Sequence, residues 1–256
     1  MKRFLNFTAL AMAVFAIALT LSSLLTPMQA VPAPILLSQN VNFKPPPVTA
    51  PENRIGATQR GCKLPEGLLI ITPLIPKSKI GLTLIESPTF FAYVSHSLTQ
   101  VEFTLQANDQ KATEVYKTTF KVDKPGIVEF SIPAMGDGQK FLEIGQPYQW
   151  SFSVVCDKDE VSEEGWRDPS GDYFAYGMVQ RIEPEETLKN DLANPDPMAR
   201  AIAYAKNGIW YETLATLAQM RRLTPDDSRL KAEWTQLLQS QGLTSIADQP
   251  LVQSFE

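Results

Sequence analysis

Histidine, the side chain most often used as a general base, occurs once in the chain, at His96. It follows an apolar run from Thr89 to Val94, which is the position of a loop or strand-end residue. No GxSxG, HExxH, phosphate-binding-loop or dinucleotide-binding pattern accompanies it. The sequence therefore predicts a protein that is not an enzyme, with no catalytic residues, no metal site and no cofactor.

Carboxylates are densest between Asp157 and Asp172, around Trp166. The spacing fails as an EF-hand calcium loop, because Val161 and Ser162 stand where that loop needs an oxygen ligand and a glycine, and this favours a solvated acidic loop. An exposed Trp166 could stack on a sugar ring or anchor a protein interface, whereas a buried one would pack over the edge of the domain. We take Trp166 as the candidate binding residue.

Residues 1–30 have the features of a secretory signal peptide. Lys2 and Arg3 give a positive start, an apolar stretch from Ala9 to Leu25 follows, and Ala30 offers a small residue for cleavage. An uncleaved anchor helix is the alternative, because the apolar stretch approaches the length that spans a bilayer. We expect an exported protein, periplasmic or extracellular, with no membrane insertion after signal cleavage.

Charge limits the partners of the exported chain. The net charge is −5, and loss of Lys2 and Arg3 with the signal makes it more negative by two. Nucleic acid and anionic membrane surfaces need an excess of Lys and Arg, so neither is expected as a partner.

The chain has two cysteines, Cys62 and Cys156, and both follow the predicted signal. An even cysteine count in an exported protein indicates a disulfide, which we predict between Cys62 and Cys156. Two buried free thiols are the alternative. A zinc site is disfavoured, because no CxxC pattern or nearby histidine completes a ligand set.

The elements that position these residues change in character along the chain. Prolines are frequent in residues 31–60, which predicts an extended linker. From 61 to 183 short runs alternate between apolar and polar residues, most clearly at Val101 to Ala107 and at Tyr148 to Val154, where Gln149, Ser151 and Ser153 face away from the core. Further strands are expected at Leu68 to Ile75, 83–86, 89–94, 116–122, 127–132 and 173–182. Pro73 marks the first of these as an edge strand, and Gly177 marks a bulge or close packing in the last. The pattern predicts an antiparallel Ig-like β-sandwich, with a barrel as the alternative.

Residues 184–243 follow a helical period. The first helix starts at Asp196-Pro197, the second carries Trp210, and the third is capped by Thr224, begins at Pro225 and carries Trp234. The spacing resembles a tetratricopeptide repeat at Tyr204, Gly208, Trp210, Leu217 and Pro225, although Thr213 stands where that repeat has alanine. We predict a TPR-like hairpin plus one helix, which packs on the sandwich or extends a partner's stack, and then a C-terminal extension, 244–256.

Several segments together resemble the cyanobacterial domain-of-unknown-function family 928. They are Gly61-Cys62, Gly81 to Thr83, Ser87 to Phe91, Tyr116 to Phe120, Pro147 to Trp150, Val155 to Asp157, Gly177 to Arg181 and Ala203 to Tyr211. The resemblance implies an exported protein of cyanobacterial type and supplies no catalytic or binding residues.

Three functional hypotheses follow. The leading one is a non-enzymatic envelope protein whose sandwich or helical tail contacts another protein. The second is a carbohydrate-binding module for wall or exported polysaccharide, since sandwiches often serve that role. The third is a hydrolase that uses two carboxylates on a glycosidic bond.

Overall fold

The computed structural model describes residues 40–47, 63–64, 67–68, 71–133, 141–154 and 173–255. Asn40–Glu256 forms one compact unit. The predicted signal peptide lies outside the described residues, as do Cys62, Cys156 and the acidic cluster with Trp166, so the predicted disulfide stays a prediction.

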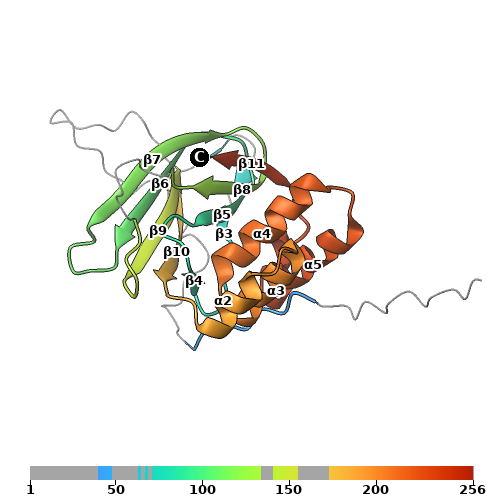
Figure 1. The fold of residues 1–256 in the computed structure, drawn as a ribbon. Helices are drawn as coiled ribbons and strands as arrows, with labels where there is room; N and C mark the ends of the chain where they lie inside the picture. The colour runs from blue at the N-terminus through green and yellow to red at the C-terminus, as the bar shows by residue number, and fades with distance from the viewer. Residues whose placement is uncertain are drawn as a thin grey trace, which may run out of the picture. The chain divides into compact units, whose positions relative to one another are not determined.

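Within the described ranges, two sheets stack face to face (Figure 1). The five-stranded sheet has the order β4 (Ile80–Thr83), β10 (Tyr173–Arg181), β9 (Pro147–Val154), β6 (Leu98–Ala107), β7 (Glu114–Val122). The four-stranded sheet has the order β11 (Leu251–Phe255), β8 (Gly126–Ser131), β5 (Thr89–Val94), β3 (Ile71–Pro73). A separate pair consists of β1 (Lys63–Leu64) and β2 (Gly67–Leu68). The predicted β-sandwich is confirmed at this level.

The prediction of a fully antiparallel sandwich is wrong, because both sheets are mixed. β4 pairs in parallel with β10, and β11 pairs in parallel with β8. Parallel partners need a long crossover between them, and both pairs join segments far apart in the chain. The strand predicted at 83–86 lies three residues earlier, at Ile80–Thr83, because Thr83 ends the pairing with β10.

Aromatic side chains from both sheets fill the space between them. Phe90 of β5 lies 5.1 Å from Phe103 of β6 and 5.2 Å from Trp150 of β9, measured between ring centroids. Gly177 faces this core, and a Cβ there would lie 2.7 Å from the Trp150 ring, which confirms the predicted close packing. Pro73 lies in β3 at the edge of its sheet, as predicted.

Four α-helices follow the sheets in the described part of the chain: α2 (Glu186–Leu192), α3 (Pro197–Lys206), α4 (Trp210–Leu223) and α5 (Ser228–Ser240). The predicted hairpin plus one helix is therefore one helix short. The missing helix, α2, buries only Leu188, so it shows no apolar period in the sequence. α3 and α4 pack against each other, but the TPR-like geometry of this pair stays a prediction.

The starts of the helices follow their capping residues. Asp196 accepts a hydrogen bond from the Met198 backbone N–H, as expected of an N-cap before Pro197. The predicted start of the last helix at Thr224-Pro225 is wrong, since Asp227 caps α5 and the Thr224 hydroxyl donates back to the Met220 carbonyl. Thr224 thus belongs to the end of α4.

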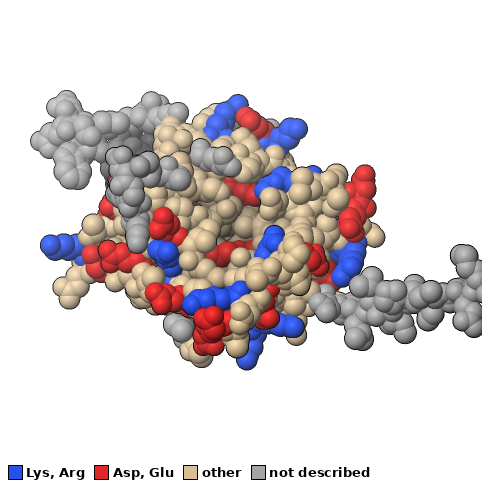
Figure 2. Space-filling view, viewed as in Figure 1, with Lys and Arg blue, Asp and Glu red and all other residues tan. Residues whose placement is uncertain are grey.

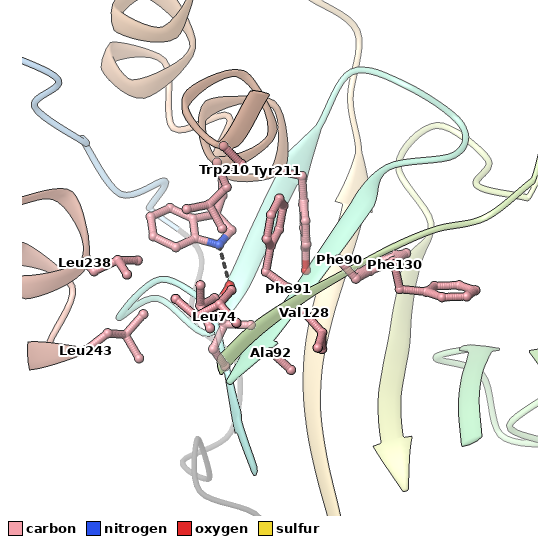
Figure 3. Packing of buried hydrophobic residues seen from close by; sticks show 14 of the residues in the cluster. Leu74, Phe90, Phe91, Ala92, Val128, Phe130, Trp210, Tyr211, Leu238 and Leu243 are labelled. Atoms are coloured by element: carbon pink, nitrogen blue, oxygen red, sulfur yellow. Dashed lines mark hydrogen bonds between the residues drawn. The ribbon is translucent and has the colours of Figure 1, made fainter. Parts of the chain in front are cut away.

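The helices are anchored on the sandwich by consecutive residues at the start of α4 (Figure 3). The indole Nε1 of Trp210 donates to the Leu74 carbonyl at 2.8 Å. The Tyr211 hydroxyl accepts from Trp150 Nε1 at 2.7 Å and donates to the Met178 carbonyl at 3.0 Å. The helical tail is therefore part of the same folded body as the two sheets.

Part of the predicted proline-rich linker packs on these helices. Val41 and Phe43 are buried, and the Phe43 ring lies 4.9 Å from Trp210 in an edge-on contact. The Val41 N–H donates to Glu233 Oε2 at 2.8 Å, and the Lys44 N–H donates to the Ala205 carbonyl at 3.0 Å. The described piece of this segment, 40–47, is extended but fixed in place.

The predicted C-terminal extension also joins the fold. After the short 3₁₀ helix η2 (Thr244–Ile246), β11 lies beside β8. Its Phe255 ring packs 4.2 Å from that of Phe120 on β7, and Gln253 donates to the Lys121 carbonyl at 3.1 Å. The last strand therefore closes one side of the sandwich.

Candidate binding face

The two sheets differ in what covers their outer faces. In β8 the five residues from Gly126 to Phe130 are all buried, because helices cover the outer face of the four-stranded sheet. Trp234 of α5 contacts Phe91 there, and Arg222 of α4 forms an ion pair with the buried Glu129. This sheet is buried on both sides.

The five-stranded sheet keeps one wet face. In β9, buried side chains alternate strictly with partly exposed ones, and the partly exposed ones include Gln149, Ser151 and Ser153. The described helices reach this side near β4, where Leu188 of α2 and Met178 of β10 belong to one small apolar cluster. The rest of the outer surface of this sheet is left uncovered by the helices (Figure 1).

Strand register places the outward side chains in three rows across the sheet. The rows are Phe174–Ser153–Glu102–Thr119, Tyr176–Ser151–Thr104–Lys117, and Met178–Gln149–Gln106–Glu114, in which Thr104 and Met178 are buried. We call these residues the outer sheet face. Directly paired residues on one face of a sheet lie about 4.5–5.5 Å apart, so each row is a continuous line of side chains.

Two aromatic rings form the β10 side of the outer sheet face. Phe174 and Tyr176 are two residues apart on one strand and therefore point the same way. Their centroids lie 6.3 Å apart with 32° between the ring planes, and both side chains are half-buried. Together they offer a strip of apolar surface along the strand.

Polar groups next to this strip are unused. In the described part of the chain, the side chains of Ser151, Ser153, Gln149 and Gln106 make no hydrogen bond. The charged pair on the face is engaged with itself, since Lys117 Nζ lies 2.9 Å from Glu102 Oε1. The middle of the outer sheet face thus carries a neutralised charged pair and donors and acceptors that no described residue engages.

Comparison with known proteins identifies the family. A family model described as Domain of Unknown Function (DUF928) matches residues 55–251. The chain belongs to this family. The resemblance to family 928 noted in the sequence is therefore confirmed, while the cyanobacterial type stays a prediction.

Other comparisons add little about this DUF928 member. No curated protein matches it. Among solved structures, the CARDB domain of the PF1109 protein from Pyrococcus furiosus, crystallised in complex with di-metal ions, matches at 10% identity. That match covers 44% of this chain and 90% of the other, with a TM-score of 0.23. A TM-score this low carries no argument about the chemistry of the present chain.

One buried carboxyl of the described residues, Glu212, serves the junction between helix and sheet. Its Oε1 accepts from the Thr83 hydroxyl at 2.6 Å and from the Leu84 N–H at 2.8 Å, while its Oε2 is buried without a partner. Burial raises the pKa of Glu212 above its ordinary value. The side chain ties α4 to the end of β4 and lies away from the outer sheet face.

Catalytic and metal-binding groups are sparse in the described ranges. His96 is half-buried between β5 and β6, with its Nδ1 2.7 Å from the Ser95 hydroxyl. No cluster of three or more His, Cys, Asp or Glu side chains in these ranges could hold a metal ion. None of the helices described combines the length and apolarity needed to cross a membrane. Acidic and basic residues are interspersed on the side of the molecule drawn in Figure 2.

The structure relates to the sequence-predicted site in two ways. Trp166, the predicted binding residue, lies outside the described residues, in the connection between β9 and β10. The outward position of Gln149, Ser151 and Ser153 was predicted from alternation and is confirmed. Phe174 and Tyr176 were not singled out, although their alternation with Ala175 and Gly177 is the signal that could have found them.

Proposed function

We propose that the chain is an exported, non-enzymatic binding module that holds a component of the cell envelope against its outer sheet face. The observation that carries the proposal is the unequal covering of the two sheets. Helices bury the outer surface of the four-stranded sheet, while the five-stranded sheet keeps Phe174, Tyr176 and a set of hydroxyl and amide groups that have no hydrogen-bond partner among the described residues.

The chemistry of the outer sheet face supports binding over catalysis. Glu102 and Lys117 neutralise each other, and neither has a described partner suited to activating a nucleophile. Rigid strands that present aromatic and hydrogen-bonding side chains meet the requirements of a recognition surface. The signal-like residues 1–30 support delivery of this surface to the envelope.

Co-sedimentation with envelopes isolated from the organism that encodes the chain tests the proposal. The chain is purified after export through its own N-terminal segment, and the bound fraction is measured against its concentration. Ser151→Arg places a bulky charge in the middle of the outer sheet face, while Ser254→Arg makes the same change at an exposed position of β11.

We expect saturable binding by the wild type and by Ser254→Arg, and at least about a tenfold loss of affinity for Ser151→Arg, since a buried unpaired charge costs well over 1.4 kcal/mol. Thermal unfolding of each variant checks that it is folded. Absence of saturable binding, or equal binding by Ser151→Arg, would refute the proposal.

A further inference from the structure

We infer that the component held by the outer sheet face is a chain of neutral sugars, an inference that rests on the proposed function. A pyranose ring carries C–H groups on its flat sides and hydroxyls around its edge. A surface that recognises it needs an apolar plane for the flat side and groups that both donate and accept for the edge. The outer sheet face has both, next to each other.

The aromatic strip supplies the apolar plane. Phe174 and Tyr176 lie 6.3 Å apart along β10 and are tilted by 32°, so sugar rings stacked on them would follow the strand. Both rings stand on the part of β10 that pairs with β9, while β4 pairs with β10 only further along, from Met178 to Arg181. The rings therefore define the direction of the bound chain.

The polar rows supply the edge contacts. Ser153 is the register partner of Phe174, and Ser151 is that of Tyr176, so one hydroxyl stands beside each ring, one strand away. Gln106 continues the polar surface on the next strand, beside Gln149, whereas Thr104, beside Ser151, is buried. Neighbouring strands lie about 4.8 Å apart, which brings the serine hydroxyls alongside a sugar seated on the rings.

Charge selects against acidic ligands. On this face Glu102 is paired with Lys117 at 2.9 Å and Lys121 with Asp123 at 2.8 Å, while the exposed Glu114, the register partner of Gln106, adds a negative charge at the β7 edge. An acidic polysaccharide or a nucleic acid would require unpaired Lys or Arg. A neutral glycan matches this balance.

The composition of the face favours a glycan over a protein. The centres of protein–protein interfaces are enriched in aromatic residues, Met and Arg and depleted in Ser. The accessible polar groups in the middle of this face are Ser151, Ser153 and two glutamines, since Thr104 is buried. A protein that covered these side chains would need a correctly placed hydrogen-bonding group for each hydroxyl and amide. A sugar carries many hydroxyls, and each of them can both donate and accept a hydrogen bond.

The test treats the same envelope preparation in two ways before co-sedimentation. Sodium periodate cleaves carbon–carbon bonds between neighbouring hydroxyls and so destroys sugar rings, while proteinase K removes accessible protein. Polysaccharide extracted from the envelopes is then passed over an anion-exchange column, and the neutral flow-through and the retained acidic fraction are each used as competitors. Variants are Phe174→Ala, Tyr176→Ala and Tyr176→Phe, with Ser254→Arg as the matched control.

We expect periodate to abolish binding, proteinase K to leave it intact and the neutral fraction to compete. Loss of one stacking ring should weaken binding by about fivefold to tenfold, whereas Tyr176→Phe keeps the stacking plane and should stay within about twofold of the wild type.

Loss of binding after proteinase K but not after periodate would overturn the inference and identify a protein partner, leaving the proposed function in place. Competition by the acidic fraction alone would also overturn it, as would full binding by both alanine variants. If Ser151→Arg binds like the wild type, the proposed function itself is refuted, and the inference about sugars loses its basis.

Discussion

Replacing Tyr211 with phenylalanine removes one oxygen atom from the junction between the helices and the sandwich. Tyr211 is 1% exposed, and burial raises the pKa of its phenol above the ordinary value, so the hydroxyl keeps its proton. It accepts from Trp150 Nε1 at 2.7 Å and donates to the Met178 carbonyl at 3.0 Å. The phenylalanine ring fills the same space, so the change isolates the two hydrogen bonds from packing.

The cost follows from the two groups left behind. The Trp150 indole is fully buried, and the Met178 residue is nearly so. The Trp150 N–H loses its partner, and a buried donor without one costs about 1–3 kcal/mol, whereas Met178 keeps register partners on both neighbouring strands. The free energy of unfolding should therefore fall by about 1–3 kcal/mol. In urea unfolding followed by tryptophan fluorescence, the midpoint should fall with an unchanged slope.

Tyr93→Phe is the matched control, because Tyr93 is half-buried on β5 and its hydroxyl makes no hydrogen bond within the described ranges. A loss for Tyr211→Phe below about 0.5 kcal/mol, equal to that of an ordinary surface change, would refute the reasoning. So would two separate unfolding transitions in the wild type, since the junction is argued to make one cooperative unit of sheets and helices.

Three further perturbations test neighbouring parts of the fold. Burial raises the pKa of Glu212 above its ordinary 4.5, so the folded protein holds a proton that the unfolded chain has lost, and stability should decline as pH rises from 4.5 through the raised pKa. Glu212→Gln keeps the acceptor oxygen but cannot ionise, and urea midpoints measured across this range should decline less steeply; an equal decline would contradict the assignment. Phe43→Ala should cost about 3 kcal/mol in urea unfolding through loss of the packing on Trp210, and a cost below about 1 kcal/mol would mean that segment 40–47 is not anchored. Gly177→Ala puts a Cβ 2.7 Å from the Trp150 ring and should cost about 1–3 kcal/mol with a changed near-ultraviolet dichroism spectrum, whereas an unchanged spectrum would argue against the close contact.

Local pattern predicted the elements of the sandwich more successfully than their partners. Alternation in β9 and in β6 identified both strands and the side of each that faces the core. The parallel pairings of β4 and β11 could not be predicted, because no periodicity encodes a distant neighbour. β4 pairs with residues 98 positions later in the chain, and β11 with residues at least 124 positions earlier.

Capping shows the limit of local rules at the start of α5. Thr224-Pro225 and Asp227 both fit the pattern of a helix start. The structure uses Asp227, whose carboxylate accepts from the Arg229 and Leu230 N–H groups, because the Thr224 hydroxyl is already bonded to the preceding helix. The sequence contains two neighbouring capping patterns of equal strength. The hydrogen bond between Thr224 and Met220, which exists only in the folded chain, decides between them.

The candidate site was predicted in part. The outward side of β9 was visible in the sequence, but nothing local says which outer face of a two-sheet protein the helices will cover. That choice depends on residues such as Glu129, a charge within an otherwise apolar strand, which finds Arg222 only when α4 lies across its sheet.

The same reasoning explains why the five-stranded sheet is left open. Covering it with a helix would bury Ser151, Ser153 and the neighbouring glutamines, and each polar group left without a partner would cost about 1–3 kcal/mol. The four-stranded sheet carries no such penalty, because β8 presents apolar side chains on both sides apart from the paired Glu129. Whatever does cover the outer sheet face must therefore bring hydrogen-bonding groups of its own to the two serines, and a ligand dense in hydroxyls meets that requirement with the fewest positional constraints.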